Sequence, residues 1–452
     1  MRKTHRCARL FFYSLLVLLY FLMLLSPSEV VKVALGLVGL LSVLLSFPGA
    51  NRLYQIIGSL FFMAGIGLAW AEGIPLQEVP EYMTSPAMLL ALLLVLPFFQ
   101  SLMRVGRFDL SLHRLLRVPV RRLDKLYIRG SLVSYLLTVF LFFAAIPIAY
   151  DLIRRHLAGL SSSLQQKLLS RTVLRGFALG TVWSPLEVLI ALVVEMTQVD
   201  FTAMLPWLLL FSSALFTADG VLSRRYRSVE WAGSGREGPL HGPVRLGWIR
   251  LLAVLVLFMG FVLLVQALLG VRFFTAVTLA IIPYAAGWAA LIGRWRRYAK
   301  HSFLNWRRQT PQLQNMVLLF FSVGFLNGIL QQSTVMDGLQ MLFHPAKDHP
   351  LLLFVTIQWF MLGMTFLGIS TLVTLSLVGV FIQPFLDSLS PLSMAIVLVT
   401  SSVAPDVAGP YNTTVILLSE RLGLSPYRIS RWNWGFSLVF GGAGVGLGYL
   451  LL

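Results

Sequence analysis

Long apolar runs with few or no charges recur along the whole chain, and they constrain its fold more than any other feature. A hydrocarbon core about 30 Å thick is crossed by a helix of about 20 predominantly apolar residues. Runs of this length lie at 8–25, 30–48, 53–71, 86–103, 131–150, 203–222, 248–269, 273–293, 313–332, 350–369 and 433–452. We therefore predict an all-α polytopic membrane protein with about 11 transmembrane helices. Further apolar stretches, interrupted by Pro, Gly and Ser, predict re-entrant or broken helices at 170–199, 371–388 and 390–424.

The composition excludes an ordinary soluble domain. The chain is 57% hydrophobic and only 12% charged, whereas soluble domains are about 25% charged. The net charge of +18 would suggest nucleic acid in a soluble protein, but here we attribute it to loops that orient membrane helices and expect no nucleic-acid partner. A single cysteine, Cys7, excludes a disulfide framework and a multi-cysteine metal site.

The distribution of basic residues predicts the orientation of the chain. Segment 104–130 carries eight Lys and Arg against two acids, whereas 72–85 has three Glu and no base. Because Lys and Arg near helix ends remain in the cytoplasm, the alternation predicts a cytoplasmic N-terminus in a multi-pass protein of the cell (inner) membrane. The first run also resembles a cleaved secretory signal. Because Ser26-Pro27-Ser28-Glu29 follows it without an Ala-x-Ala site, we expect 1–29 to be a retained extra helix.

The chain aligns with itself at a spacing of 225 residues. Residues 183–207 lie over 408–432, so that Pro185 meets Pro410, Glu195 meets Glu420 and Trp207 meets Trp432. The strongly basic loop 104–130 then corresponds to the nearly neutral loop 333–349, which places equivalent loops on opposite sides of the membrane. We predict two inverted-topology repeats, an architecture common among transporters. The repeats are 30–222 and 248–452, joined by a basic cytoplasmic linker at 223–247.

Each repeat contains one apolar stretch cut by residues that break helices. Proline removes a backbone donor, and in hydrocarbon the freed carbonyl groups need partners, so such breaks persist only inside protein or around a cavity. Their alternative explanation is a packing kink. Two breaks in corresponding positions favour a binding site, because opened carbonyls hold cations and helix N-termini face anions. The predicted substrate and ion-binding residues are Ser184, Pro185, Glu187, Ser401, Ser402, Asp406, Gly409, Pro410, Asn412, Thr413 and Thr414.

Other charged residues surround these breaks. The most polar intramembrane patch is predicted between Asp387 and the pair Arg428 and Arg431. Arg171 and Arg175 precede the first break. They have three alternative roles: pairing with Glu187, balancing a substrate anion, or extending to the membrane interface.

The second break resembles a family signature. Gly409-Pro410-Tyr411-Asn412-Thr413-Thr414 is similar to the Ser-Asn-Thr motif of the dicarboxylate branch of the ion transporter superfamily, with Tyr411 in place of the serine. This superfamily includes divalent anion:sodium symporters, citrate carriers and arsenite permeases. The first break departs from the motif, since Ser184-Pro185-Leu186-Glu187 has no Asn-Thr. The resemblance implies an elevator-type secondary transporter in which Asn412 and Thr413 hold substrate or cation and Glu187 is a titratable or cation-binding group.

These features predict a secondary active transporter rather than an enzyme. We expect it to move a small anionic solute by symport with sodium or protons. The alternative is a membrane-embedded enzyme or lipid-handling protein of cell-envelope polymer assembly. There is no Gly-x-x-x-x-Gly-Lys-Ser/Thr phosphate loop, and the histidines are scattered, so we expect no metal site, no catalytic residues and no cofactor beyond a coupling ion. The expected partners are the solute, membrane lipids and a second copy in a homodimer.

Overall fold

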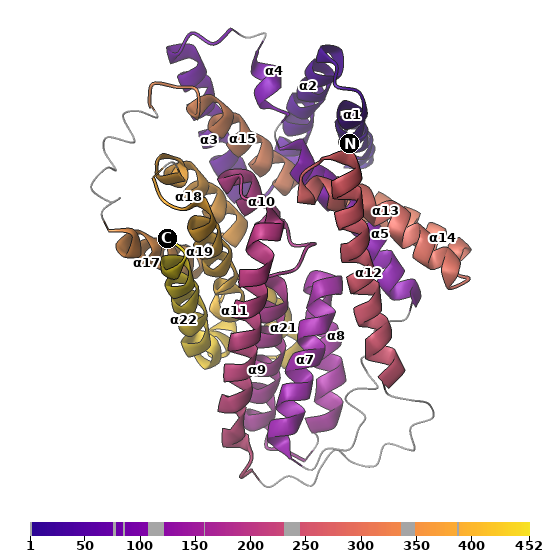
Figure 1. The fold of residues 1–452 in the computed structure, drawn as a ribbon, viewed down its shortest axis with the longest axis vertical. Helices are drawn as coiled ribbons and strands as arrows, with labels where there is room; N and C mark the ends of the chain where they lie inside the picture. The colour runs from indigo at the N-terminus through magenta and orange to yellow at the C-terminus, as the bar shows by residue number, and fades with distance from the viewer. Residues whose placement is uncertain are drawn as a thin grey trace. The chain divides into compact units, whose positions relative to one another are not determined.

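A computed structural model of the chain describes residues 2–75, 78–84, 86–106, 122–157, 159–229, 245–335, 349–386 and 388–452. All regular structure in these ranges is helical, as Figure 1 shows. Asp387, most of the linker 223–247, and much of the loops 104–130 and 333–349 lie outside the described residues. The all-α class is therefore confirmed for the part of the chain that the structure describes.

The helices have the following bounds. The first sequence half contains α1 (Arg2–Leu25), α2 (Glu29–Ser46), η1 (Phe47–Gly49), α3 (Arg52–Ala71), α4 (Val79–Tyr82), α5 (Ala87–Gly106), α7 (Leu123–Leu141), η2 (Phe142–Ala144), α8 (Ala145–Arg154), η3 (Arg155–Leu157), α9 (Ser162–Thr181), α10 (Val188–Thr197), α11 (Phe201–Leu222) and η4 (Ser223–Tyr226). The second contains α12 (Arg245–Leu269), α13 (Phe273–Leu291), α14 (Trp295–Gln309), η5 (Thr310–Gln312), α15 (Gln314–Leu330), α17 (Pro350–Phe366), α18 (Thr371–Leu386), α19 (Pro391–Val403), α20 (Pro405–Ala408), α21 (Thr413–Leu422) and α22 (Pro426–Leu450).

Apolar helices make this a polytopic membrane protein. Among the described residues, seven helical stretches are long and apolar enough to cross a hydrocarbon core, or eight if the bent pair α14–α15 is one span. The helices α1, α2 and α3 bury one face and leave large side chains such as Phe11, Leu44 and Leu60 exposed. Apolar faces of this extent belong against lipid. The membrane class is confirmed, while the predicted number of about 11 spans remains a prediction.

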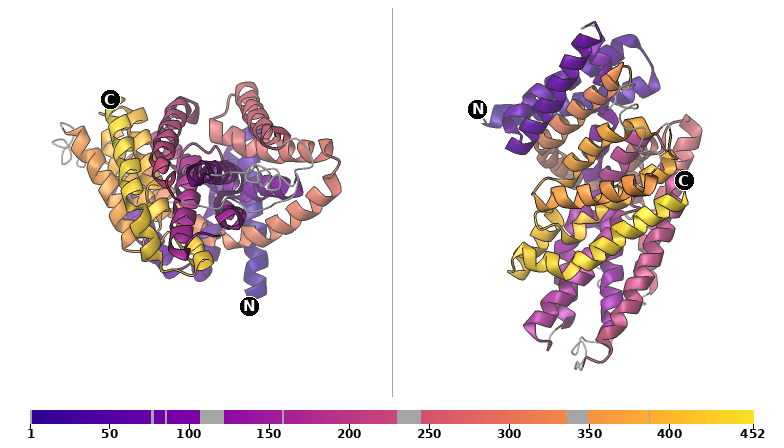
Figure 2. Two further views of the ribbon diagram at one scale, coloured as in Figure 1. Left: turned by 90° about the horizontal axis from the view of Figure 1, so that it is seen from below. Right: turned by 90° about the vertical axis from the view of Figure 1, so that its left-hand side faces the viewer.

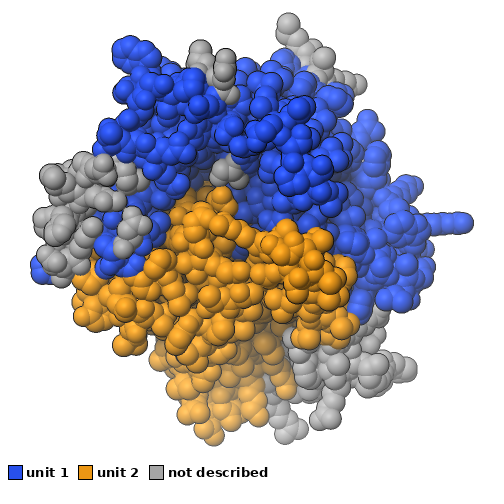
Figure 3. All heavy atoms as spheres, turned by 45° about the horizontal axis from the view of Figure 1, so that its top comes forward, with its two compact units in different colours: residues 1–102, 274–349, 376–389 blue, residues 103–273, 350–375, 390–452 orange. Residues whose placement is uncertain are grey.

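The chain divides into two compact units, coloured separately in Figure 3. Unit 1 comprises 1–102, 274–349 and 376–389, and unit 2 comprises 103–273, 350–375 and 390–452. Each unit combines segments of both predicted repeats, so the units divide the chain differently from the repeats. Within unit 1, α15 packs against α2 and α3, and α1 packs against α2 (Figure 2).

Unit 2 has two helices that are buried on nearly all sides. From Leu168 to Thr181 most of α9 is buried, and α19 is buried from Ser393 to Val403. A helix that is buried all round belongs to the interior of its unit. The helix α9 packs mainly against α7, and α19 packs mainly against α22. Both predicted broken segments lie in this unit.

The apolar run 131–150, predicted as one span, is two helices in the structure. The helix α7 ends at Leu141, Phe142 takes a positive φ of 53°, and α8 begins at Ala145. The two helices pack against each other. The span at 131–150 is therefore corrected to a helical hairpin. Hydropathy alone does not reveal the turn, because it is made by apolar Phe142-Phe143-Ala144 rather than by Pro or Gly.

Several helix boundaries recur at the spacing of 225 residues. The helix α10 covers 188–197 and α21 covers 413–422, while α11 begins at 201 and α22 at 426. The caps correspond as well. Glu187 and Asn412 are the N-caps of α10 and α21. The residues that follow the two helices, Gln198 and Gly423, are their C-caps and have left-handed φ values of 58° and 64°. Equal lengths and equal caps at one spacing support an internal repeat in unit 2.

Close helix packing in unit 2 predicts a stability effect at Gly176. A Cβ added there would lie 2.5 Å from the carbonyl oxygen of Ser131 on α7, in the manner of small residues that let membrane helices approach. We expect Gly176→Ala to lower the stability by about 1–3 kcal/mol through overpacking, measured as a lower thermal unfolding midpoint in detergent. The matched control is Gly442→Ala on α22, where an added Cβ meets nothing within 4 Å. Equal midpoints for the two variants would contradict this packing.

Candidate functional site

The first break lies between α9 and α10 and ends at a buried carboxylate. Glu187 has extended backbone angles and is 1% exposed. Its Oε1 accepts a hydrogen bond from the backbone N–H of Leu189 at 3.2 Å, which caps α10. Its Oε2 is buried and has no hydrogen-bond partner among the described residues. Ser184 and Pro185 are buried in the turn before it, and Ser184 Oγ accepts from the N–H of Leu186.

The second break is closed by a local network of hydrogen bonds. Asn412 caps α21 by accepting from the N–H of Thr414, and its Nδ2 donates to Asp406 Oδ1 at 2.8 Å and to Thr371 Oγ1 at 3.2 Å. Thr414 Oγ1 donates in turn to the carbonyl oxygen of Asp406. Gly409 is required for the close turn, because a Cβ there would meet the Thr365 methyl group. The amide of Asn412 is therefore already occupied within the protein.

The remaining predicted residues differ in whether their side chains have hydrogen-bond partners. Ser402 Oγ donates to the carbonyl oxygen of Val399 at 2.9 Å, whereas Ser401 Oγ is buried without a partner in the described part of the chain. The same is true of Thr181 Oγ1 at the end of α9. Pro410 is buried, and Thr413 is exposed at the first turn of α21. Unfilled hydrogen-bonding capacity therefore lies at Glu187, Ser401 and Thr181, while the second break is largely satisfied internally.

Unit 2 brings the two breaks together. The short helix α20, which follows Ala404, packs against α9, and α10 packs against α19. Glu187 and Asp406 are close enough to interact electrostatically. Neither forms an ion pair with any residue that the structure describes. Two buried carboxyl groups without a cation are costly in a membrane protein, so this arrangement suits a bound cation or proton.

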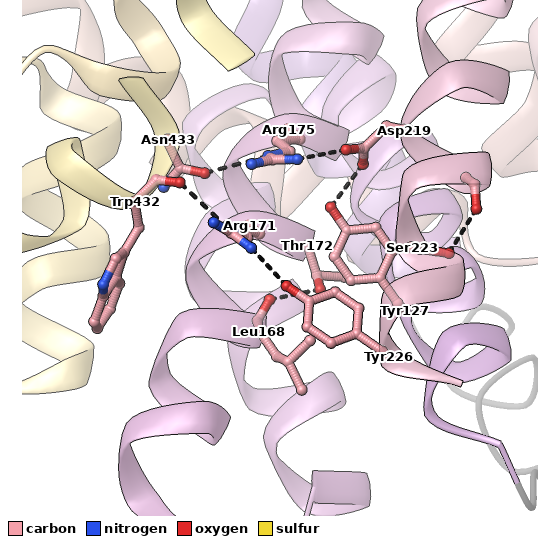
Figure 4. Close-up of polar contacts among 11 residues, drawn as sticks. Tyr127, Leu168, Arg171, Thr172, Arg175, Asp219, Ser223, Tyr226, Trp432 and Asn433 are labelled. Carbon is pink, nitrogen blue, oxygen red and sulfur yellow. Dashed lines mark hydrogen bonds and ion pairs between the residues drawn. The ribbon is translucent and has the colours of Figure 1, made fainter. Parts of the chain in front are cut away.

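Arg171 and Arg175 do not pair with Glu187. Arg175 forms a buried ion pair with Asp219 on α11, and Tyr127 donates to the other carboxylate oxygen at 2.6 Å (Figure 4). Arg171 donates to the Tyr226 hydroxyl at 2.6 Å and to the carbonyl oxygen of Trp432. Arg175 is 5% exposed, so its side chain is enclosed by protein rather than by lipid or water.

Sequence reasoning missed most of this network, although one signal was present. Asp219 is the only charged residue in the apolar run 203–222, which marks it as a residue that needs a partner. Asn433 gave no such signal. Its Oδ1 lies 3.4 Å from Arg175 Nε, and its Nδ2 donates to Ser170 Oγ at 2.7 Å. The network thus connects α7, α9 and α11 with α22, which belongs to the other predicted repeat.

Asp387, at one end of the predicted polar patch, lies outside the described ranges. The basic members of the patch, Arg428 and Arg431, are exposed near the start of α22, and Arg428 stacks over the Trp432 ring.

Comparisons with known proteins identify the fold. No protein-family model matches the chain, and no curated protein matches it. Among solved structures, the chain is similar to the YdaH transporter of Alcanivorax borkumensis, whose crystal structure is described as having an unusual topology. The TM-score is 0.62 at 15% sequence identity, over 88% of this chain and 97% of that one. At this identity the likeness shows a shared fold.

The buried ion pair predicts that replacing Asp219 lowers the stability of the protein much more than replacing the exposed Asp151 does. Asp219→Leu leaves Arg175 charged and unpaired, which costs about 3–5 kcal/mol, so we expect a much lower unfolding midpoint in detergent. The control is Asp151→Leu, because Asp151 pairs with Arg421 at 3.7 Å while both side chains are about half exposed. Such pairs contribute about 0–1 kcal/mol. An Asp219 variant as stable as the Asp151 variant would show that the buried pair contributes little.

Proposed function

We propose that the protein is a secondary active transporter that moves a small anionic solute together with a proton or sodium ion through the two breaks of unit 2. The observation that carries the proposal is Glu187: a buried carboxylate at a helix N-cap, with one oxygen unpartnered, and a second buried carboxyl group, Asp406, within range of electrostatic interaction. A cation or proton at Glu187 would remove the cost of the buried charge.

The binding of an anionic solute is compatible with these acids only if a cation accompanies it. The N-terminus of α21 is capped by the neutral Asn412, and its first turn carries the exposed Thr413. Helix N-termini attract negative groups. The N-terminus of α10, in contrast, is capped by Glu187, which would repel an anion until neutralised. We therefore infer that cation binding at Glu187 precedes or accompanies solute binding at α21, which is symport.

The division of the chain supports an elevator mechanism with inverted repeats. Both breaks belong to unit 2, so one compact body would carry the whole site. The matching bounds and caps of α10 and α21 support the repeat, and the solved structure of similar fold is described as a transporter. We propose membership of the ion transporter superfamily on the Asn412-Thr413 motif alone. A cytoplasmic N-terminus, a cell (inner) membrane location and a homodimer complete the proposal.

The alternative function is covalent processing or handling of a lipid-linked envelope polymer. Such an enzyme needs acid or base groups that reach a headgroup outside the hydrocarbon, whereas Glu187 and Asp406 are almost fully buried. Uptake of solute by proteoliposomes separates the two functions, because a transporter leaves its substrate chemically unchanged.

Glu187→Gln tests the coupling group. The amide keeps the size of the side chain and one acceptor for the Leu189 N–H, so we expect a folded protein with transport reduced at least about tenfold, equal to about 1.4 kcal/mol. Uptake is measured in proteoliposomes under a proton or sodium gradient. Glu420→Gln is the control, because Glu420 is exposed on α21, the helix that corresponds to α10 in the other predicted repeat. We expect this variant to transport at the wild-type rate. Unchanged uptake by both Glu187→Gln and Asn412→Ala would show that the site is elsewhere.

A ligand screen tests the class of solute. Organic anions, amino acids and inorganic oxyanions are added to detergent-purified protein with and without sodium, and the unfolding midpoint is recorded. We expect one anion class to raise the midpoint, because a ligand that binds only the folded protein stabilises it, and we expect Glu187→Gln to abolish dependence on the cation. If no solute shifts the midpoint while a lipid-linked substrate is chemically altered, the enzyme alternative is correct.

A further inference from the structure

The helix α14 in unit 1 is far too polar to lie in hydrocarbon. Its sequence, Trp-Arg-Arg-Tyr-Ala-Lys-His-Ser-Phe-Leu-Asn-Trp-Arg-Arg-Gln, has four Arg, one Lys and no acid. Gly293, with a φ of 68°, precedes it, and the stretch 295–312 meets α15 at a bend of 58°. Because five charges cannot be buried in lipid without partners, α14 belongs at the membrane surface, where the apolar helices α13 and α15 begin or end.

One face of α14 is attached to the protein. Tyr298 and Ser302 are buried. Asn305 Nδ2 lies 3.4 Å from Ser101 Oγ on α5, and His301 Nδ1 lies 3.1 Å from the same oxygen. This polar face fixes the helix to unit 1 and determines which side chains remain free.

A second face is apolar and accessible. Trp295, Ala299, Phe303 and Trp306 follow one another at helical spacing, and the side chains of Trp295 and Phe303 are 50% and 55% exposed. Aromatic rings in such positions favour the boundary between headgroups and acyl chains.

The third face is basic. Arg296, Lys300 and Arg307 recur at the same helical spacing, are exposed, and form no ion pair with any described residue. Arg297 and Arg308 flank them. A basic stripe next to an aromatic stripe is the arrangement of helices that lie in the plane of an anionic membrane surface.

The N-terminus of α1 adds charge to this surface. Arg6 donates to the carbonyl oxygen of Arg308 at 3.4 Å, which brings the two elements together. Arg9 Nη1 is buried and has no hydrogen-bond partner in the described residues. None of α1, α5, η5 and α14 contains an Asp or Glu, so these four elements supply no carboxylate to compensate the bases.

We propose that α14, with the N-terminus of α1, is a binding surface for anionic phospholipids. The headgroup phosphates pair with Arg296, Lys300 and Arg307, while Trp295 and Phe303 insert at the acyl boundary. Each Lys or Arg near an anionic membrane surface lowers the free energy of lipid binding, and salt weakens this attraction by screening it. This inference is independent of the transport function, because α14 belongs to unit 1 and the two breaks belong to unit 2.

The test uses full-length protein in neutral detergent, titrated with phosphatidylglycerol or phosphatidylcholine and followed by native mass spectrometry of bound lipid. We expect wild-type protein to prefer phosphatidylglycerol, and the triple variant Arg296→Gln, Lys300→Gln, Arg307→Gln to bind it about a hundredfold more weakly. The charge-matched control is Arg224→Gln, Arg225→Gln, Arg227→Gln at η4, where the three arginines are also exposed. It should retain the wild-type affinity within about threefold.

Two results would overturn the proposal: equal binding of both lipids by wild-type protein, or equal losses in the two triple variants. Should the α14 variant fail to fold, the wild-type protein still provides a test. Raising the salt from about 0.05 to about 0.5 M shortens the Debye length severalfold and should release phosphatidylglycerol but not phosphatidylcholine. Retention of phosphatidylglycerol at high salt would exclude an electrostatic lipid surface.

Discussion

The absence of water from the hydrocarbon layer is the constraint on which the architecture depends. Every backbone group freed by a broken helix must find a partner within the protein, and unit 2 supplies these partners from side chains at the breaks. Glu187 and Asn412 cap the two helices that follow, while Asp406 and Thr414 close the second loop around Asn412. The helices that lead into the breaks, α9 and α19, are buried on nearly all sides, so the breaks lie inside protein, as the lack of water in hydrocarbon requires.

Unit 2 buries charged groups of two kinds, one with a partner of opposite charge and one without. Arg175 and Asp219 form a compensated pair: Tyr127 donates a hydrogen bond to Asp219, and Arg175 Nε donates one to Asn433. A pair of this kind is strongly destabilised when one partner is lost, so it holds α9, α11 and α22 together. Glu187 and Asp406, in contrast, have no cationic partner in the described chain. An acidic pair without a cationic partner is the feature on which the proposed coupling-ion site depends.

The sequence located both helix breaks but not the hydrogen bonds around them. Proline, glycine and the Asn-Thr pair located both interruptions, which the structure has at 182–187 and 404–412. Asn412 drew attention as a ligand, yet its side chain is occupied by Asp406, Thr371 and Thr414. Glu187 has the unpartnered oxygen instead. Whether a polar side chain is free depends on how the chain folds around it: the partners of Asn412 lie 2, 6 and 41 residues away, and hydropathy does not show which of them it meets.

The sequence by itself determined the helical membrane class and the residue types at both breaks, because apolar length and helix-breaking residues act locally along the chain. Only the tertiary structure decided that Arg175 meets Asp219, 44 residues away, that Phe142 divides an apolar run into a hairpin, and that α14 leaves its aromatic and basic faces uncovered. These outcomes follow from which helices pack side by side, and that choice is made by complementary surfaces rather than by the hydropathy of any single segment.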